Sequence, residues 1–221
     1  IVNIFLTGGT GFLGKNFLKL ALKKNHKVTA LTRKLKKPFK HKNLKWLTGS
    51  IENNWTRELK KNDILVHFAA EGVTQSNPID TYDVNIFQSE KLIKNAIKSH
   101  CKRWLIISSS SEYGNQRKRY KELSKNTNRL PNSDYALSKA IFSDIIVRLA
   151  KKYKCKARIM RVFYVFGVGE KRKRLIPGLI NAISKNKNFV IKNPNEMRDF
   201  SDIKYVTNVL LDALSFNKNQ F

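Results

Sequence analysis

Short runs of apolar residues alternate with amphipathic stretches along most of the chain. The apolar runs predict buried strands, which we place at residues 1–6, 28–31, 44–47, 64–70 and 104–107. The amphipathic stretches predict helices, and the longest lies at 80–99 with an apolar side made of Val84, Phe87, Leu92, Ile93 and Ala96. A further amphipathic helix is expected at residues 203–214. Strands that alternate with helices form a parallel sheet covered on both faces, so we predict a doubly wound α/β fold.

A glycine-rich turn joins the first predicted strand to the helix that follows it. Residues 7–14 read TGGTGFLG. Gly8 permits a tight turn, Gly11 lets a pyrophosphate approach the backbone because it has no Cβ, and Gly14 lets the helix pack close to the strand. The first turn of the helix offers free N–H groups and a partial positive charge to phosphates. This order of elements predicts dinucleotide binding at the carboxyl edge of a Rossmann-like sheet, and an ordinary tight turn is the alternative.

The ends of the second and fourth strands bear on the choice of cofactor. The second strand ends in Thr32 and is followed by Arg33 and Lys34. An acidic residue here would bind the free 2′-hydroxyl of NAD, whereas an arginine accommodates the 2′-phosphate of NADP. We therefore favour NADP slightly over NAD, and a solvated basic loop is the alternative. The fourth strand runs into Ala69 and Ala70, whose small side chains allow a cofactor to approach closely.

The fifth strand ends in a run of serines at 108–111, and a helix that contains Tyr135 and Lys139 follows. Ser133 or Asn132 caps this helix, and the spacing of four residues puts the phenol and the ammonium on one helix face. A nearby ammonium favours the phenolate, so we expect the pKa of Tyr135 to fall from about 10 toward neutrality. Tyr135 would then act as general acid/base on a carbonyl or alcohol, with a serine hydroxyl on the same oxygen and a nicotinamide exchanging the hydride. A surface pair without function is the alternative.

The bulk properties exclude several classes of protein. The 221 residues suffice for one sizeable core, and no apolar stretch is long enough for a transmembrane helix. The N-terminal residues lack the pattern of a secretory signal, so we expect a cytoplasmic protein. Cys101 and Cys155 fit no metal-binding or redox spacing and are expected to be reduced and structural. His67 lies within an apolar strand and is expected in the core.

The formal net charge of +28 suggests a different class of partner. Such a charge attracts nucleic acid or an anionic membrane surface. The lysines are spread along the whole chain, however, so we interpret them as solvated residues and expect neither of these partners. The basic run at 171–174 fits a solvated helix start and phosphate attraction equally well. A non-catalytic dinucleotide-binding or nucleic-acid-associated protein remains the alternative function.

Several segments taken together resemble the extended short-chain dehydrogenase/reductase family. The segments are the glycine turn at 7–14, Ser108-Ser109 before Tyr113-Gly114, YALSK at 135–139, RVFYVFG at 161–167 and Arg198-Asp199-Phe200. More closely, the chain resembles the NAD(P)-dependent epimerase/dehydratase group that acts on nucleotide-sugars. This resemblance implies an enzyme with NADP or NAD as cofactor and a nucleotide-sugar as substrate.

The resemblance also implies roles for individual residues. Ser109 matches the catalytic serine or threonine of the group, Tyr135 the catalytic base and Lys139 the ribose-binding lysine. Arg198 matches an arginine that contacts the pyrophosphate, for which a guanidinium fork is suited, and a surface ion pair with Asp199 is the alternative. The expected substrate contacts are Ser109, Ser110, Tyr164 and Arg198. The expected cofactor-binding residues are Gly8, Gly11, Phe12, Leu13, Gly14, Thr32, Arg33, Ser50, Ile51, Ala69, Ala70, Asn85, Tyr135 and Lys139.

The chain departs from the pattern of the group in the segments that contact the sugar. Dehydratases of the group carry Asp-Glu directly after the catalytic residue, where this chain has Ser110 and Ser111, and Glu112 comes one position later. This departure favours a 4-epimerase or 4-keto reductase over a dehydratase. Tyr164 stands where the group has Asn, and Val168 where it has Pro. The identity of the sugar and of the nucleotide therefore stays open.

We divide the chain into a dinucleotide-binding domain at 1–163 and a partial substrate-binding lobe at 164–221 that is interleaved with the sheet. Members of the group continue for about a hundred further residues. A start at Ile1 rather than Met is what a fragment of a longer protein would show.

Two further expectations concern the surface. The polar, basic loop at 115–130 has the length of a functional lid. Members of the group often form homodimers through the helix that carries the tyrosine. On that helix, either this contact or the core would be served by Phe142, Ile146 and Leu149.

Overall fold

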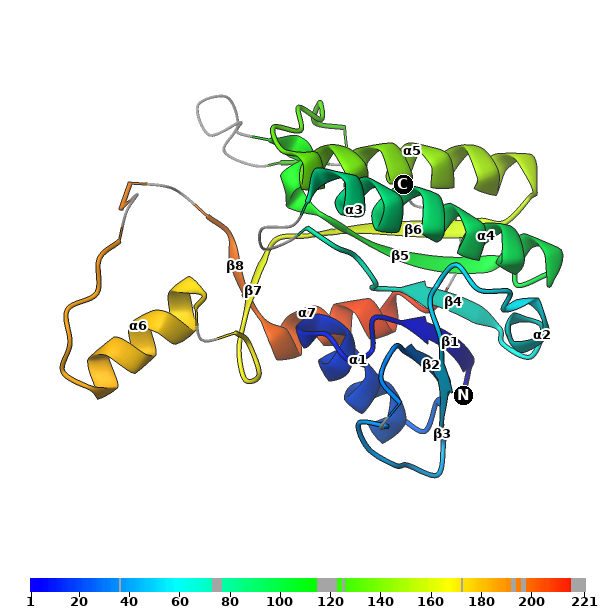
Figure 1. The fold of residues 1–221 in the computed structure, drawn as a ribbon, viewed down its shortest axis with the longest axis horizontal. Coiled ribbons are helices and arrows are strands. Elements are labelled where there is room, and N and C mark those ends of the chain that lie inside the picture. Colours follow the sequence, from blue (N-terminus) through cyan, green and yellow to red (C-terminus); the bar gives the residue numbers. More distant parts are fainter. Residues whose placement is uncertain are drawn as a thin grey trace.

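Six parallel strands form the central sheet of the computed structural model (Figure 1). The structure describes residues 1–35, 37–72, 77–114, 123–124, 126–171, 173–191, 194–195 and 198–215. The strand order is β3-β2-β1-β4-β5-β6, which confirms the predicted doubly wound α/β fold. The strands are β1 (Asn3–Thr7), β2 (Lys27–Thr32), β3 (Leu44–Thr48), β4 (Ile64–His67), β5 (Arg103–Ser109) and β6 (Lys156–Val162).

Helices cover both faces of this sheet (Figure 1). On one face lie α1 (Phe12–Lys23) and α7 (Ile203–Asp212). On the other face lie α3 (Pro78–Tyr82), α4 (Ser89–Lys98) and α5 (Asp134–Lys152). The remaining helical segments are α2 (Thr56–Leu59), the π-helical η1 (Asp83–Gln88), the 3₁₀-helical η2 (Ser110–Tyr113) and α6 (Leu175–Ser184).

Alternate residues of the strands supply the two hydrophobic cores, one on each face of the sheet. Phe5 of β1 packs in the same core as Phe142 of α5. Its neighbour Leu6 packs in the opposite core with Phe17 of α1 and Leu210 of α7. The C-terminal helix α7 is therefore part of the core beneath the sheet. The division of the chain at residue 163 stays a prediction.

His67 is a core residue, as predicted. Its side chain is 1% exposed, Nδ1 lies 2.7 Å from Thr7 Oγ1, and Nε2 lies 3.0 Å from Ser89 Oγ. Burial lowers the pKa of His67 to about 3, so the ring is neutral and ties β1, β4 and α4 together. Cys101 and Cys155 are also buried, and both are free thiols as expected.

The helical segment predicted at 80–99 contains a π-helical turn, η1, between α3 and α4. A π-helix closes its hydrogen bonds over five residues instead of four, which changes the direction in which the following side chains point. Phe87 is consequently 58% exposed, so its placement on the apolar side was wrong. Leu92, Ile93 and Ala96 of α4 are buried as predicted.

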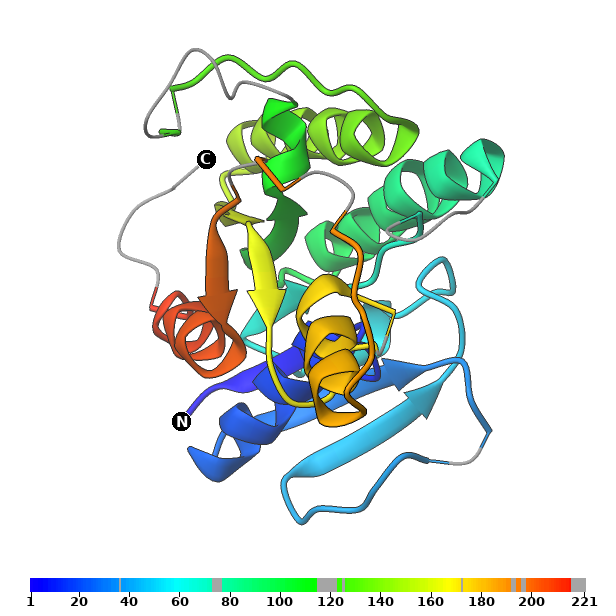
Figure 2. The same cartoon turned by 90° about the vertical axis from the view of Figure 1, so that its left-hand side faces the viewer.

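A smaller lobe lies beside the carboxyl edge of the main sheet. β7 (Tyr164–Phe166) and β8 (Phe200–Asp202) form a two-stranded parallel sheet. Helix α6 projects beyond these strands, away from the main sheet (Figures 1 and 2). Within the described ranges, no helix combines the length and the apolar character that crossing a membrane requires.

Candidate functional site

A cavity of 1610 Å³ opens at the carboxyl edge of the sheet, where the strand order reverses between β1 and β4. Its walls come from the segments that follow β1, β2, β4, β5 and β6, from β7 and β8, and from the residues before α6. Ligands of open α/β sheets bind in a crevice at such a reversal. The volume exceeds the ~300–1,000 Å³ of a site for one small ligand, so the cavity has room for two ligands side by side.

The glycine turn between β1 and α1 forms one wall of the cavity. Gly8 has a φ of 70°, and a Cβ on Gly14 would lie 2.3 Å from the Gly8 carbonyl oxygen. The turn therefore closes only with glycine at these two positions. A Cβ on Gly11 would instead lie 3.4 Å from the same oxygen, which is an ordinary contact. The space in front of Gly11 is open, and it adjoins the N-terminus of α1, where backbone N–H groups attract a phosphate.

The expected cofactor-binding residues line this cavity, with the exception of Asn85. The Asn85 side chain is buried in η1, where Oδ1 accepts a hydrogen bond from the Glu71 N–H over 2.8 Å. Its Nδ2 donates to the Glu71 carbonyl over 2.9 Å and to Ser138 Oγ over 2.9 Å. Asn85 thus braces the segment after β4 against α5 instead of facing the cavity. For the lining residues, contact with a cofactor remains a prediction.

Ser109 and Tyr135 meet inside the cavity. Ser109 is the last residue of β5, and α5 begins just before Tyr135 because Ser133 caps it by accepting from the Ala136 N–H over 3.2 Å. The Ser109 and Tyr135 hydroxyls are hydrogen bonded. Burial raises the pKa of Tyr135, while the hydrogen bond from Ser109 and the positive charge of Arg174 act in the opposite direction. The phenol is therefore protonated at neutral pH.

The raised pKa differs from the expectation that Lys139 makes Tyr135 acidic. Lys139 is 3% exposed, and its Nζ donates to the Ile107 carbonyl of β5 over 2.8 Å. Burial lowers the pKa of Lys139 itself to about 8. The predicted spacing puts both side chains on one side of α5, but the loss of water around the phenol is the largest effect on its pKa, and it raises that pKa.

The substrate side of the cavity contains an arginine packed on aromatic rings. The Arg198 guanidinium lies 4.7 Å from the centroid of the Tyr164 ring, and the rings of Tyr164 and Phe200 lie 5.6 Å apart. All three residues line the cavity together with Ser109 and Ser110. A cation over an aromatic face is held in place by the ring quadrupole. The Arg198 fork is thus fixed where it can bind an anionic group.

Further charged and polar side chains line the cavity, among them residues of the basic run at 171–174. Arg174, together with Lys171 and Lys173 of the predicted basic run, lies before α6, and Arg172 falls outside the described residues. Glu71 and Gln88 also line the cavity, and no sequence pattern marks either of them. The basic run was the available signal for Arg174, but only the fold brings it near Tyr135.

Two further features noted in the sequence remain, Glu112 and the predicted lid at 115–130. Glu112 is 0% exposed, and its carboxylate binds Arg129 and Arg161, so it does not face the cavity. Most of the predicted lid, residues 115–122 and 125, lies outside the described residues.

A parallel sheet with a glycine turn and a crevice at its reversal point is the arrangement typical of Rossmann-like dinucleotide-binding folds. The model of the NAD dependent epimerase/dehydratase family matches residues 4–220. The chain therefore belongs to this family of enzymes, which confirms the resemblance to the extended short-chain dehydrogenases/reductases.

Individual relatives agree with this assignment. The chain is 27% identical to a GDP-6-deoxy-D-talose 4-dehydrogenase of Aggregatibacter actinomycetemcomitans over 97% of its own length and 70% of the relative's. The solved UDP-N-acetylglucosamine 4-epimerase from Methanobrevibacter ruminantium M1, in complex with UDP-N-acetylmuramic acid, superposes with a TM-score of 0.89 at 25% identity, over 99% of this chain and 74% of the other. The dTDP-glucose 4,6-dehydratase of Bacillus anthracis, in complex with NAD, has the same fold at 24% identity, with a TM-score of 0.84 over 97% and 72% of the two chains.

The chain spans between 56% and 71% of the length of eight curated relatives that it matches. We therefore state the activity, substrate and partners of the whole protein as proposals.

Proposed function

We propose that this protein oxidises or reduces C4 of a nucleotide-linked sugar with a bound nicotinamide cofactor, as a 4-epimerase or a 4-keto reductase. The observation that carries the proposal is the hydrogen-bonded pair of Ser109 and Tyr135 at the inner end of a cavity with a dinucleotide turn. Relatives whose names specify chemistry at C4, such as a 4-dehydrogenase and a 4-epimerase, support the choice of carbon.

The residues of the cavity fit a dinucleotide. The N-terminus of α1 lacks a side-chain cap, so its N–H groups are left for a phosphate, and the space before Gly11 admits one. When bound, the cofactor supplies or accepts the hydride. We propose that Lys139, now on the Ile107 carbonyl, also donates to a hydroxyl of the cofactor ribose.

The proton is handled by Tyr135. As a protonated phenol it donates to the oxygen at C4 when a ketone is reduced, and as a phenolate it removes the proton when the alcohol is oxidised. The Ser109 hydroxyl, hydrogen bonded to the same phenol, holds the substrate oxygen in line. Elimination of water needs a further acid near C5 and C6. Ser110 and Ser111 cannot supply one and Glu112 is buried, so a dehydratase is disfavoured.

The proposal is tested with the purified protein, NAD or NADP, and UDP-, GDP-, CDP- and dTDP-linked hexoses and their 4-keto forms. NMR of the products identifies the configuration at C4. Formation of the C4 epimer, or of a 4-hydroxy product from a 4-keto sugar, is expected for one nucleotide. Elimination of water from the sugar, or transfer of hydride to none of these compounds, would overturn the proposal.

Arg198 is proposed to bind the diphosphate of the substrate. Arg198→Ala should weaken binding of the preferred nucleoside diphosphate by about 10–100-fold, since a charge-assisted hydrogen bond contributes about 1.5–3 kcal/mol. Binding of the corresponding nucleoside monophosphate should be weakened less by the same substitution. Calorimetry measures both, and Arg198→Lys, which keeps the charge without the fork, is the control and should show an intermediate loss. Equal losses for the diphosphate and the monophosphate would argue against this role.

NADP is proposed as the preferred cofactor, because Arg33 lines the cavity after β2 and no acidic residue follows that strand. Arg33→Ala should weaken NADPH binding by about tenfold and leave NADH binding unchanged, because only NADPH has the 2′-phosphate. Fluorescence titration measures both constants. Lys34→Ala is the control, since Lys34 is exposed and does not line the cavity. A wild-type protein that prefers NADH would refute the assignment.

A homodimer is proposed through the face made by η1 and α5. Phe142 and Ile146 are buried in the core and Leu149 packs against it, so these residues are not available for the contact. Exposed apolar residues of the neighbouring helices α3, η1 and α5 include Ile79, Phe87, Leu137 and Ile141. Ile141→Asp should convert a dimer into a monomer, as measured by light scattering, because a buried unpaired carboxylate opposes association. Leu35→Asp, at an exposed apolar residue elsewhere, is the control and should leave the mass unchanged.

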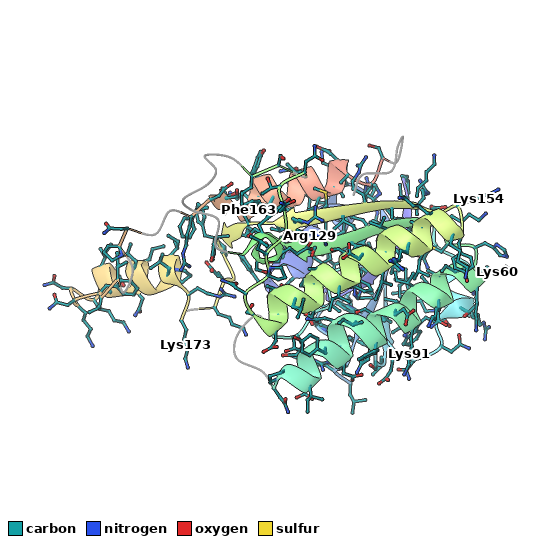
Figure 3. All side chains as sticks on the ribbon, turned by 90° about the horizontal axis from the view of Figure 1, so that it is seen from above. Lys60, Lys91, Arg129, Lys154, Phe163 and Lys173 are labelled. Carbon is teal, nitrogen blue, oxygen red and sulfur yellow. The ribbon has the colours of Figure 1, made fainter. Side chains whose placement is uncertain are left out.

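The alternative function, a protein associated with nucleic acid, is less well supported than the enzymatic function. Lysines such as Lys60, Lys91 and Lys154 lie on different elements and extend outward along the body of the molecule (Figure 3). Dispersed charges of this kind support the interpretation as solvated residues.

A further inference from the structure

Glu112 is a buried carboxylate directly beneath the proposed catalytic pair. It lies in η2, three residues after Ser109, and is 0% exposed. Oε1 accepts hydrogen bonds from Ser108 Oγ and, over 2.8 Å, from Ser143 Oγ. Oε2 accepts from Arg161 Nε over 2.8 Å and from Arg129 over 3.3 Å. Both carboxylate oxygens are thus bound by side chains from other segments.

The partners of Glu112 belong to four different parts of the fold. Ser108 ends β5 beside Ser109, Ser143 lies on α5 two turns after Tyr135, and Arg161 is on β6. Arg129 comes from the segment that leads into α5, and Figure 3 shows it beside that helix. It also donates to the Ala140 carbonyl over 3.2 Å and to Asp144 over 2.6 Å. One carboxylate therefore joins the strand that ends in Ser109 to the helix that contains Tyr135.

A buried ion cluster of this kind contributes little net stability, because desolvation offsets most of the attraction between the charges. It does fix geometry, since each hydrogen bond has a narrow range of distance and angle. Catalytic groups lose rate steeply when they are displaced, by up to about a hundredfold for 1 Å. The position of the cluster therefore matters more for catalysis than for stability.

We propose that Glu112 is a positioning residue that holds Ser109 against Tyr135. This inference rests on the catalytic roles proposed for Ser109 and Tyr135. Neither oxygen of Glu112 reaches the cavity, so Glu112 acts through its partners.

The negative charge of Glu112 also affects the pKa of Tyr135, and the direction of this effect follows from the charges around the phenol. The charge of Glu112 raises the pKa of Tyr135 and that of Lys139, in both cases by less than burial changes it. Among the described residues, the other charged group that acts on the pKa of Tyr135 is Arg174 from the segment before α6, which lowers it. Removal of the Glu112 charge should therefore lower the pKa of Tyr135, because the positive charge of Arg174 is then no longer opposed.

The test compares Glu112→Gln, which removes the charge, with Ser108→Ala and Ser143→Ala, which each remove one hydrogen bond and keep the charge. Ser99→Ala is the matched control, since Ser99 is a buried serine at the far end of α4 with one bond to the Ala96 carbonyl. The pKa of Tyr135 is read by NMR of ¹³C-labelled tyrosine, assigned with Tyr135→Phe. Turnover gives kcat and KM for the preferred nucleotide-sugar, and a thermal melt shows that each variant is folded.

We expect Glu112→Gln to lower the pKa of Tyr135 and the two serine variants to leave it in place. All three should reduce kcat, by about tenfold, with KM little changed, whereas Ser99→Ala should change only the melting temperature. If Glu112→Gln does not fold, the two serine variants test the inference. A positioning role lowers their kcat and leaves their KM nearly unchanged. A Tyr135 pKa that does not move in folded Glu112→Gln, or serine variants with normal kcat, would overturn the inference. The NMR titration needs no substrate, so a shifted pKa without any turnover would count against the proposed function alone.

Discussion

Tyr135→Phe is expected to lower the rate of hydride transfer by about 10²–10⁴-fold, the usual contribution of a positioned general acid or base. The ring remains, so the packing of α5 is preserved, and only the hydroxyl that meets Ser109 is lost. Cofactor binding should change little. Single-turnover measurement of nicotinamide reduction or oxidation gives the rate directly.

Tyr205→Phe is the matched control for this substitution. Tyr205 lies on α7 and is 66% exposed, away from the cavity lining. Loss of the Tyr205 hydroxyl should leave the rate of hydride transfer unchanged. A Tyr135→Phe protein that transfers hydride as fast as the wild type would exclude Tyr135 as the acid/base.

The raised pKa of Tyr135 fixes the direction of the pH dependence. Reduction of a ketone needs the protonated phenol, so its rate falls as the pH rises through that pKa. Oxidation of the alcohol needs the phenolate, so its rate rises over the same range. Profiles measured in the two directions should therefore be mirror images on the alkaline side.

Gly11→Ala is expected to abolish dinucleotide binding while the protein keeps its stability. The added methyl would lie 3.4 Å from the nearest protein atom, so the fold accommodates it. It would occupy the space through which a pyrophosphate reaches the N–H groups of α1, so the dissociation constant should rise about a hundredfold or more. Fluorescence titration and a thermal melt on the same sample measure the two effects.

The neighbouring glycines provide two controls. A Cβ on Gly9 would meet only the ends of the Leu6 and Leu18 side chains, at 3.1 and 3.5 Å, so Gly9→Ala should bind and fold nearly normally. A Cβ on Gly14 would meet backbone at 2.3 Å, so Gly14→Ala should lose stability, by about 3 kcal/mol or more. Equal behaviour of Gly9→Ala and Gly11→Ala in the titration would show that the ligand does not approach this turn.

The sequence was sufficient for the parts of the fold that depend on local pattern. Apolar runs and the glycine turn predicted the first five strands of the sheet, because a fully buried strand shows few polar residues. Ser109 and Tyr135 both line the cavity at this edge of the sheet, and their catalytic roles stay a prediction. The positions of β6, β7 and β8 were not predicted, and a helix start was only one of two interpretations of the basic run before α6.

The parts that depend on distant residues could not be derived in this way. Lys139 donates to the Ile107 carbonyl, and Asn85 is hydrogen bonded to the Glu71 backbone, and both contacts join segments that are far apart in the sequence. The environment of Glu112 needs Arg129 and Arg161, which no spacing in the sequence relates to it. The burial that raises the pKa of Tyr135 is likewise a property of the assembled fold.

The most direct measurement follows a deuterium atom placed at C4 of the preferred nucleotide-sugar. The protein is mixed with this sugar and oxidised cofactor, stopped during the first turnover, and the nicotinamide is analysed by mass spectrometry. Deuterium should appear on the nicotinamide in the wild-type protein and be absent in Tyr135→Phe and Gly11→Ala. Product that forms while the nicotinamide carries no deuterium at any point of the first turnover, or deuterium that goes to water, would show that the cofactor does not oxidise C4 at this site.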